Sequence, residues 1–207
     1  MSQTTRTEAF SDGILAIAAT LLVLDLRVPA RAVLLHGSLR AALGASWPAY
    51  FAYVTSFLVI GIIWVNHHAV FELIDRVDRV TLFLNLMLLM TVVAIPFTTA
   101  LLSEYLTASR ADARTAALVY SALMLAMSLA FASLYNYIAR QTALLAEGID
   151  PTSVRASILR FSAVGILLYL ATMVLALVSA PLCLAAHLAI ALYYCFQLIP
   201  THRPAAT

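Results

Sequence analysis

Long apolar blocks separated by short charged connectors dominate this sequence. About 20 consecutive apolar residues are what an α-helix needs to cross the hydrocarbon core of a bilayer. Pro96 is expected to interrupt one block, because proline lacks a backbone N–H and clashes with the preceding helical turn. The sequence therefore predicts an all-α integral membrane protein whose residues 1–207 form a single six-helix domain. The predicted transmembrane spans are Ala9–Leu26, Trp47–Val65 with the helix continuing to Leu73, Val80–Leu102, Ala116–Ile138, Ile158–Ser179 and Leu182–Ile199.

Composition excludes several classes of protein. Hydrophobic residues make up 63% of the chain and charged residues only 11%, whereas soluble domains carry roughly 25% charged residues. The net charge of +2, without any lysine- or arginine-rich tract, argues against a nucleic-acid partner. The sequence also lacks a glycine-rich phosphate loop, an HExxH motif and a GxSxG motif, so we do not expect an enzyme.

The arginines predict the orientation of the chain. If the N-terminus is cytoplasmic, alternate connectors place more arginines on the inner side than on the outer side, as the positive-inside rule requires. Both termini are therefore expected in the cytoplasm. The inner set is Arg6, Arg76, Arg79, Arg140, Arg155, Arg160 and Arg203, and the outer set is Arg27, Arg31, Arg40, Arg110 and Arg114.

The first span carries ionisable residues where a bilayer makes them costly. Asp12 lies about one turn inside the span, beside Ser11 and Phe10, with Arg6 a turn earlier. A carboxylate at that depth needs a partner or a water-filled cavity. A helix that only anchors a protein has no use for it, so we expect this helix to carry the function.

Further polar residues lie at a similar predicted depth. The second span contains Trp64, His67 and His68 near its inner end, and Asn85 stands alone among leucines in the third. Because buried polar groups need hydrogen-bond partners, we expect Ser11 and Asp12 to form a network with Asn85 and one of the two histidines. Such a network would fix the register of the first helix.

Two other interpretations of these polar residues are weaker. Adjacent histidines point about 100° apart on a helix, so His67 and His68 cannot easily chelate one metal ion. A hydrolase built from Ser11, His67 and Asp12 fails because adjacent Ser and Asp on one helix cannot flank a histidine in triad geometry. We therefore predict neither a catalytic site nor a metal site.

An aliphatic stripe follows the polar residues. At about 100° per residue, Ile17, Thr20, Leu21 and Leu24 fall on one face of the first helix. Around a symmetric axis, rings of such residues would form hydrophobic constrictions that gate a pore by dewetting. The alternative is an ordinary packing or lipid-facing stripe, and spacing alone does not decide between the two.

These residues also carry a family resemblance. The stretch Arg6-x-x-x-Phe10-Ser11-Asp12, opening the first of six spans, resembles the signature of the transmembrane protein 175 family of endosomal and lysosomal potassium channels, in its prokaryotic branch. The similarity extends over essentially the whole chain. Its other elements are Trp64-x-x-His67-His68-x-x-Phe71, Asn85 and Pro96-Phe97.

The resemblance implies a potassium-selective leak channel without a cofactor, in which K⁺ permeates passively along the first helix. It places the main constriction at Ile17, a contribution to selectivity at Thr20, and further hydrophobic rings at Leu21 and Leu24. The FSD motif with its His and Asn partners would stabilise assembly. Because this chain holds one six-helix repeat where animal members hold two, the resemblance implies a homotetramer in the cell membrane.

Other classes remain as alternatives. Proton permeation is also attributed to members of that family. A secondary transporter would be expected to show broken helices at matching positions in two halves, but only the third span contains an internal proline. A non-conducting scaffold would carry the buried polar residues at a cost and for no gain.

Overall fold

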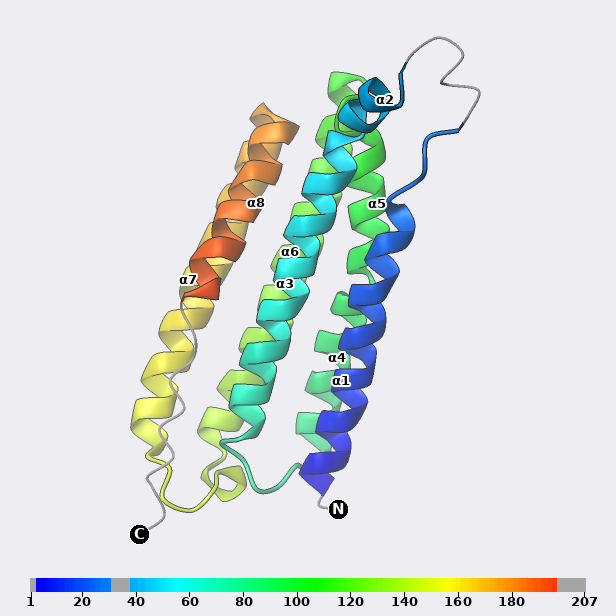
Figure 1. Cartoon of the computed structure of the whole chain (residues 1–207). Coiled ribbons are helices and arrows are strands. Elements are labelled where there is room, and N and C mark those ends of the chain that lie inside the picture. Colours follow the sequence, from blue (N-terminus) through cyan, green and yellow to red (C-terminus); the bar gives the residue numbers. More distant parts are fainter. Residues whose placement is uncertain (1–2, 31–37, 197–207) are drawn as a thin grey trace.

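The computed structural model describes residues 3–30 and 38–196, which form a bundle of long helices without a β-strand in those ranges (Figure 1). Ile74 and Leu145 form an isolated antiparallel bridge between two loops at one end of the bundle. The elements are α1 (Gln3–Leu21), η1 (Leu22–Asp25), α2 (Leu39–Ala45), α3 (Trp47–Phe71), α4 (Arg79–Val93), α5 (Ile95–Tyr105), α6 (Arg110–Arg140), η3 (Thr142–Leu144), α7 (Pro151–Val178) and α8 (Ala180–Cys195).

Five helical segments of the described chain are long and apolar enough to cross a membrane. α8 is equally apolar, but its 16 described residues make it shorter than these five. The predicted end of the sixth span at Ile199 lies outside the described residues. The fold is thus that of a multi-pass all-α membrane protein. The five segments are Thr4–Asp25, Trp47–Phe71, Arg79–Tyr105, Arg110–Arg140 and Val154–Val178.

Several helix ends differ from the sequence prediction. α1 begins at Gln3 rather than Ala9, and its α-helical part ends at Leu21, where a 3₁₀ turn takes over. α6 begins at Arg110 because the Ser109 hydroxyl accepts a hydrogen bond from the third helical N–H. Hydropathy marks only the apolar part of a helix, so it misses polar turns stabilised by caps.

The third predicted span is interrupted, as expected from its proline. α4 ends at Val93 and α5 begins at Ile95, with Pro96 in the first turn of α5. Proline is accommodated in the first turn because its missing N–H would have no intrahelical acceptor there. The short helix α2, by contrast, was not predicted from the sequence.

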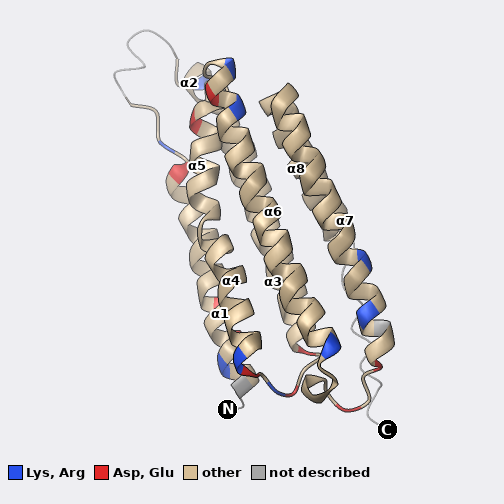
Figure 2. Ribbon diagram, turned by 180° about the vertical axis from the view of Figure 1, so that it is seen from behind, with Lys and Arg blue, Asp and Glu red and all other residues tan. Residues whose placement is uncertain are grey.

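α1 lies at one edge of the bundle, and α7 and α8 lie at the other (Figures 1 and 2). α6 packs against α4, α5, α7 and α8, whereas α1 packs mainly against α3 and α4. Charged residues gather at the two ends of the bundle, and the long stretches between them are almost uncharged (Figure 2). This arrangement leaves one side of α1 without a neighbour in the described chain.

Asp78 holds the start of α4. One carboxylate oxygen accepts hydrogen bonds from the Thr81 backbone N–H at 2.8 Å and from the Thr81 hydroxyl at 2.7 Å. The other oxygen accepts a hydrogen bond from Tyr137 of α6. Desolvation by burial raises the pKa of Asp78, but these hydrogen bonds lower it by more, so the pKa lies below its usual value of 3.8. Asp78 therefore both caps α4 and joins it to α6.

Replacing Asp78 with alanine is expected to lower the free energy of unfolding by about 1–2 kcal/mol, the cost of losing an N-cap acceptor. Because the pKa of Asp78 is lower in the folded state, its contribution is complete above 3.8 and is lost as the pH falls through the folded value. Thermal denaturation at neutral and acidic pH measures both effects. Asp78→Asn, which keeps a capping oxygen, serves as the control. An unchanged melting temperature for Asp78→Ala at neutral pH would contradict the capping role.

Candidate functional site

α1 has one buried face and one exposed face. The buried side chains recur every three or four residues, as expected for a helix packed on one side. The opposite side of the helix meets no other part of the described chain. The buried set is Thr4, Thr7, Ser11, Leu15, Ala18 and Leu22.

The four residues of the predicted stripe lie on the exposed side. Ile17 is 60% exposed, Leu21 41% and Leu24 73%. Thr20 is also exposed, and its hydroxyl donates to the Ile17 carbonyl at 2.9 Å. Leu24 lies in the 3₁₀ turn η1, where 100° per residue no longer applies, so its alignment with Ile17 differs from the prediction for a uniform α-helix.

A buried hydrogen-bonded chain joins three helices at the N-terminal half of α1. The Asn85 amide of α4 donates to the Ser11 hydroxyl at 2.9 Å, and its carbonyl oxygen lies 2.9 Å from His67 Nε2 of α3. The Ser11 hydroxyl in turn donates to the Thr7 carbonyl at 3.0 Å. The side chains of Ser11, Asn85 and His67 are each at most 1% exposed. The structure thus brings together Ser11, Asn85 and His67.

The directions of these hydrogen bonds define the His67 tautomer. Because the Asn85 carbonyl oxygen can only accept, His67 Nε2 must carry a proton and donate it. His67 Nδ1 is buried and has no hydrogen-bond partner in the described chain. The His67 ring stacks on Phe71, with centroids 4.3 Å apart. The hydrogen-bonded chain therefore ends at the His67 ring, which lies between the Asn85 amide and the Phe71 ring.

Asp12 and His68 belong to a second, more exposed set of contacts. The Trp64 indole N–H donates to an Asp12 carboxylate oxygen at 3.0 Å. His68 pairs with Glu8 of α1, and its ring stacks on Trp64 with centroids 6.4 Å apart. The two histidines therefore bind different partners: His67 reaches Ser11 through Asn85, and His68 reaches Glu8.

Arg6 and Phe10 are the motif residues that these contacts leave out. Both are exposed, Phe10 by 54%. Neither takes part in the hydrogen bonds and ion pairs described above. Their position on the open side of α1 leaves them available to another molecule.

Ser11 contacts Thr7 and Asn85 rather than a histidine, so no base activates its hydroxyl. Across residues 3–30 and 38–196, no three His, Cys, Asp or Glu side chains are grouped as metal ligands.

Two contacts of the first helix were not predicted from the sequence. Glu8 lies one turn before Asp12, so their i, i+4 spacing could have indicated a shared face, but nothing indicated His68 as the partner of Glu8. At the other end, the Ser103 hydroxyl of α5 donates to Asp25 at 2.9 Å. Together these contacts fix both ends of the first helical segment to the bundle.

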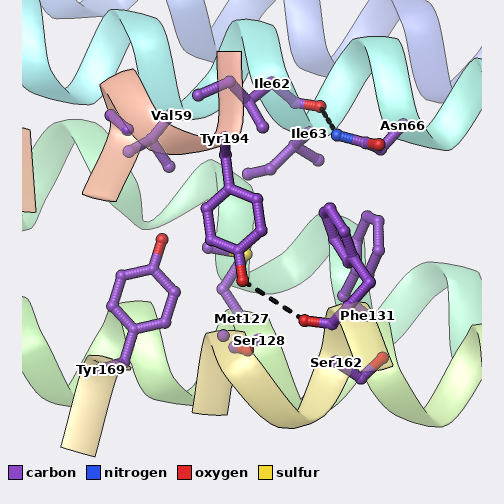
Figure 3. A pocket seen from close by; sticks show the side chains of 13 residues that line it. Val59, Ile62, Ile63, Asn66, Met127, Ser128, Phe131, Ser162, Tyr169 and Tyr194 are labelled. Carbon is purple, nitrogen blue, oxygen red and sulfur yellow. Dashed lines mark hydrogen bonds between the residues drawn. The ribbon is translucent and has the colours of Figure 1, made fainter. Parts of the chain in front are cut away.

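A separate cavity of about 50 Å³ lies between α3, α6, α7 and α8 (Figure 3). Its lining is mostly apolar, and the Tyr194 hydroxyl at its wall donates to the Phe161 carbonyl at 3.3 Å. The buried Ser162 hydroxyl has no partner among the described residues. A water needs about 10–15 Å³ on this scale, so the cavity has room for a few waters. No residue of α1 lines it.

Comparison with known proteins identifies relatives along the whole chain. Residues 6–96 match the model of the family described as endosomal/lysosomal potassium channel TMEM175. A potassium channel of Streptomyces collinus is 53% identical over 97% of this chain and 95% of its own length. An endosomal/lysosomal proton channel TMEM175 of Gallus gallus is 36% identical over 69% of this chain, but the match covers only 28% of that longer protein.

A solved structure agrees with these matches. The crystal structure of a lysosomal potassium-selective channel TMEM175 homolog from Chamaesiphon minutus superposes with a TM-score of 0.86 at 38% identity, covering 95% of this chain and 98% of that one. The similarity in fold thus extends over nearly the whole chain. On this identity and coverage, the chain belongs to the TMEM175 family.

Proposed function

We propose that this chain is a potassium leak channel of the cell membrane, formed by four copies around a central pore. α1 lines the pore, α8 completes the sixth span, and both termini lie in the cytoplasm. K⁺ permeates passively, and Ile17, Leu21 and Leu24 form hydrophobic rings with Thr20 between them. The observation that carries this proposal is the exposed face of α1, which carries these residues together with Arg6 and Phe10 of the family motif.

The exposed face of α1 differs from an ordinary lipid-facing surface. It contains a stripe of small residues with the spacing i, i+4, i+7, i+11: Ala9, Gly13, Ala16 and Thr20. Small residues let helices approach closely in membranes. The exposed side of α7 has alanines too (Ala156, Ala163 and Ala171), but they are interspersed with the large side chains Leu159, Leu167, Leu170, Val174, Leu177 and Val178. The contrast supports a helix–helix contact for α1 and a lipid contact for α7.

The polar contacts support a structural role for the FSD motif. Ser11 and Asp12 point to Asn85 and Trp64 within the same chain. They are therefore poor candidates for direct ligands of the permeant ion. We assign them to holding α1 in the rotation that presents Ile17 and Thr20 to the pore, while Arg6 and Phe10 contact a neighbouring copy.

Ion flux into liposomes containing purified protein tests the proposed function. A potassium gradient is expected to drive K⁺ uptake that does not saturate and does not require the protein to transport a second ion in the opposite direction. Uptake of Na⁺ is expected to be slower. Protein-free liposomes provide the control. Saturating flux with obligatory counter-transport would instead indicate a secondary transporter. No cation flux under any gradient would contradict the channel.

Proton permeation is a second candidate function, because the relative of Gallus gallus is named a proton channel. The same liposomes loaded with a pH-sensitive dye test it. Acidification of the lumen under a proton gradient, without added potassium, would support proton permeation. Its absence alongside K⁺ flux would exclude it.

Replacing Gly13 with leucine is expected to prevent assembly of the four copies while leaving the single chain folded. A Cβ at Gly13 would meet no atom within 4 Å in this chain, so a larger side chain there obstructs only a neighbouring copy. Light scattering coupled to size-exclusion chromatography should show a shift from tetramer to smaller species. Gly44→Leu in α2, where a Cβ also meets nothing within 4 Å, is the matched control. A tetrameric Gly13→Leu variant would contradict the contact.

A further inference from the structure

A cavity of about 270 Å³ opens at the end of the bundle opposite the start of α1, between the first turns of α6 and the turn that joins α7 to α8. It is formed by two elements far apart in sequence. Arg110 and Arg114 of α6 line one side, and Leu177, Ser179 and Pro181 line the other. Unlike the cavity of Figure 3, it presents positive charge beside apolar side chains.

The two arginines lack anionic partners. Arg110 and Arg114 are four residues apart, so they lie one turn apart on the same face of α6. Neither makes an ion pair with a residue of the described chain. The carboxylate between them, Asp112, accepts a hydrogen bond from the Ser109 hydroxyl and does not line the cavity. The cavity therefore presents two exposed arginines that form no ion pair within the described chain.

The cavity lies at the depth of the lipid headgroups. α6 has 31 residues and is about 46 Å long, which exceeds the roughly 30 Å of the hydrocarbon core. No charged residue occurs between Arg114 and Arg140, so the apolar core of the membrane must surround that stretch. Arg110 and Arg114 then lie at the border between hydrocarbon and headgroups, where phosphates are found.

The walls of the cavity are continuous with a lipid-facing surface. Leu177 and Val178 of α7 and Leu182 of α8 are exposed apolar residues next to the turn. A free phosphate ion would gain nothing from them. A phospholipid, whose acyl chains run down the bundle from its phosphate, would contact both the arginines and these side chains.

We propose that this cavity binds the headgroup phosphate of an anionic phospholipid such as phosphatidylglycerol. Arg110 and Arg114 supply planar guanidinium groups that can bind phosphate oxygens in pairs. Basic pockets between transmembrane helices bind anionic headgroups on the cytoplasmic side of membranes, and in the proposed orientation the same chemistry operates here at the outer leaflet. The positive end of the α6 dipole adds to the attraction. The proposal does not depend on ion conduction.

Lipid titration of the purified protein tests the site. Thermal stability is measured against short-chain phosphatidylglycerol, against phosphatidylcholine of the same chain length, and against inorganic phosphate. Phosphatidylglycerol is expected to stabilise the wild type at the lowest concentration. At about 1 kcal/mol for each arginine near a membrane surface, affinity for phosphatidylglycerol should fall about fivefold for each of Arg110→Gln and Arg114→Gln.

Two control variants separate binding from folding and from overall charge. Arg110→Lys combined with Arg114→Lys keeps the charge but loses the paired guanidinium hydrogen bonds, so its response to phosphatidylglycerol should lie between those of the wild type and the glutamine variants. Arg155→Gln combined with Arg160→Gln removes two charges elsewhere on the protein, on exposed positions of α7, and should leave the response unchanged. If the Arg155/Arg160 double variant lost as much of the stabilisation by phosphatidylglycerol as the double variant with glutamine at Arg110 and Arg114, the proposed site would be wrong. Stabilisation by inorganic phosphate equal to that by phosphatidylglycerol would overturn the lipid assignment.

Discussion

Replacing Ile17 with asparagine is expected to raise potassium flux through the reconstituted protein on the order of tenfold and to reduce its preference for potassium over sodium. Ile17 is 60% exposed on the open side of α1, where four copies would form an apolar ring that excludes water. An asparagine ring can hydrogen-bond to the water around a permeating ion. One net hydrogen bond of about 1.4 kcal/mol corresponds to about a tenfold change in rate.

The matched control for Ile17 is Leu167→Asn. Leu167 of α7 is 66% exposed, and α7 lies at the opposite edge of the bundle from α1 (Figure 1). The same polar side chain there should leave flux and selectivity at wild-type values, because that surface faces lipid in the proposed assembly. Equal behaviour of the two variants would show that Ile17 is not at a constriction.

The course of the helices could largely be predicted from the sequence, because apolar length is the dominant constraint in a bilayer. The interruption before Pro96 followed from the chemistry of proline alone. α2 was missed because it is a seven-residue helix with no buried residue, so no hydrophobic periodicity marks it. The first turns of α1 and α6 were missed because they are polar, and hydropathy detects neither polar turns nor the Ser109 cap that starts α6.

The sequence predicted which polar residues of the site lie at a similar depth, but not which of them contact each other. The sequence placed Ser11, Asn85 and a histidine at a similar depth, but their pairing depends on the rotation of α3 relative to α1 and α4. That rotation is set by side-chain packing across three helices, which a single sequence does not reveal. The same holds for Glu8, whose partner His68 lies 60 residues away. The change from α to 3₁₀ geometry at Leu22 had no sequence signal either.

Replacing Asn85 with leucine is expected to lower the melting temperature by about 5–10 °C. The substitution removes the hydrogen bonds to Ser11 and His67, both of which are buried. Such bonds in membrane proteins average about 0.6 kcal/mol and reach about 1.7 kcal/mol. Because both partners are fully buried, the two hydrogen bonds are expected near the upper limit, at about 2–3 kcal/mol in total. Each kcal/mol shifts the melting temperature of a protein of this size by about 2–4 °C.

A second substitution distinguishes the loss of hydrogen bonds from poor packing of the new leucine. Adding His67→Phe to Asn85→Leu removes the imidazole N–H that is left unpaired, and a phenyl ring can keep the stack on Phe71. Because replacing both partners by apolar groups is far less costly than leaving one unpaired, the double variant should recover most of the lost stability. Asn136→Leu is the control, since the Asn136 amide donates to the Ala132 carbonyl within its own helix. If Asn85→Leu lowered the melting temperature no more than Asn136→Leu, the buried hydrogen bonds of Asn85 would not be what holds α1 against α3 and α4.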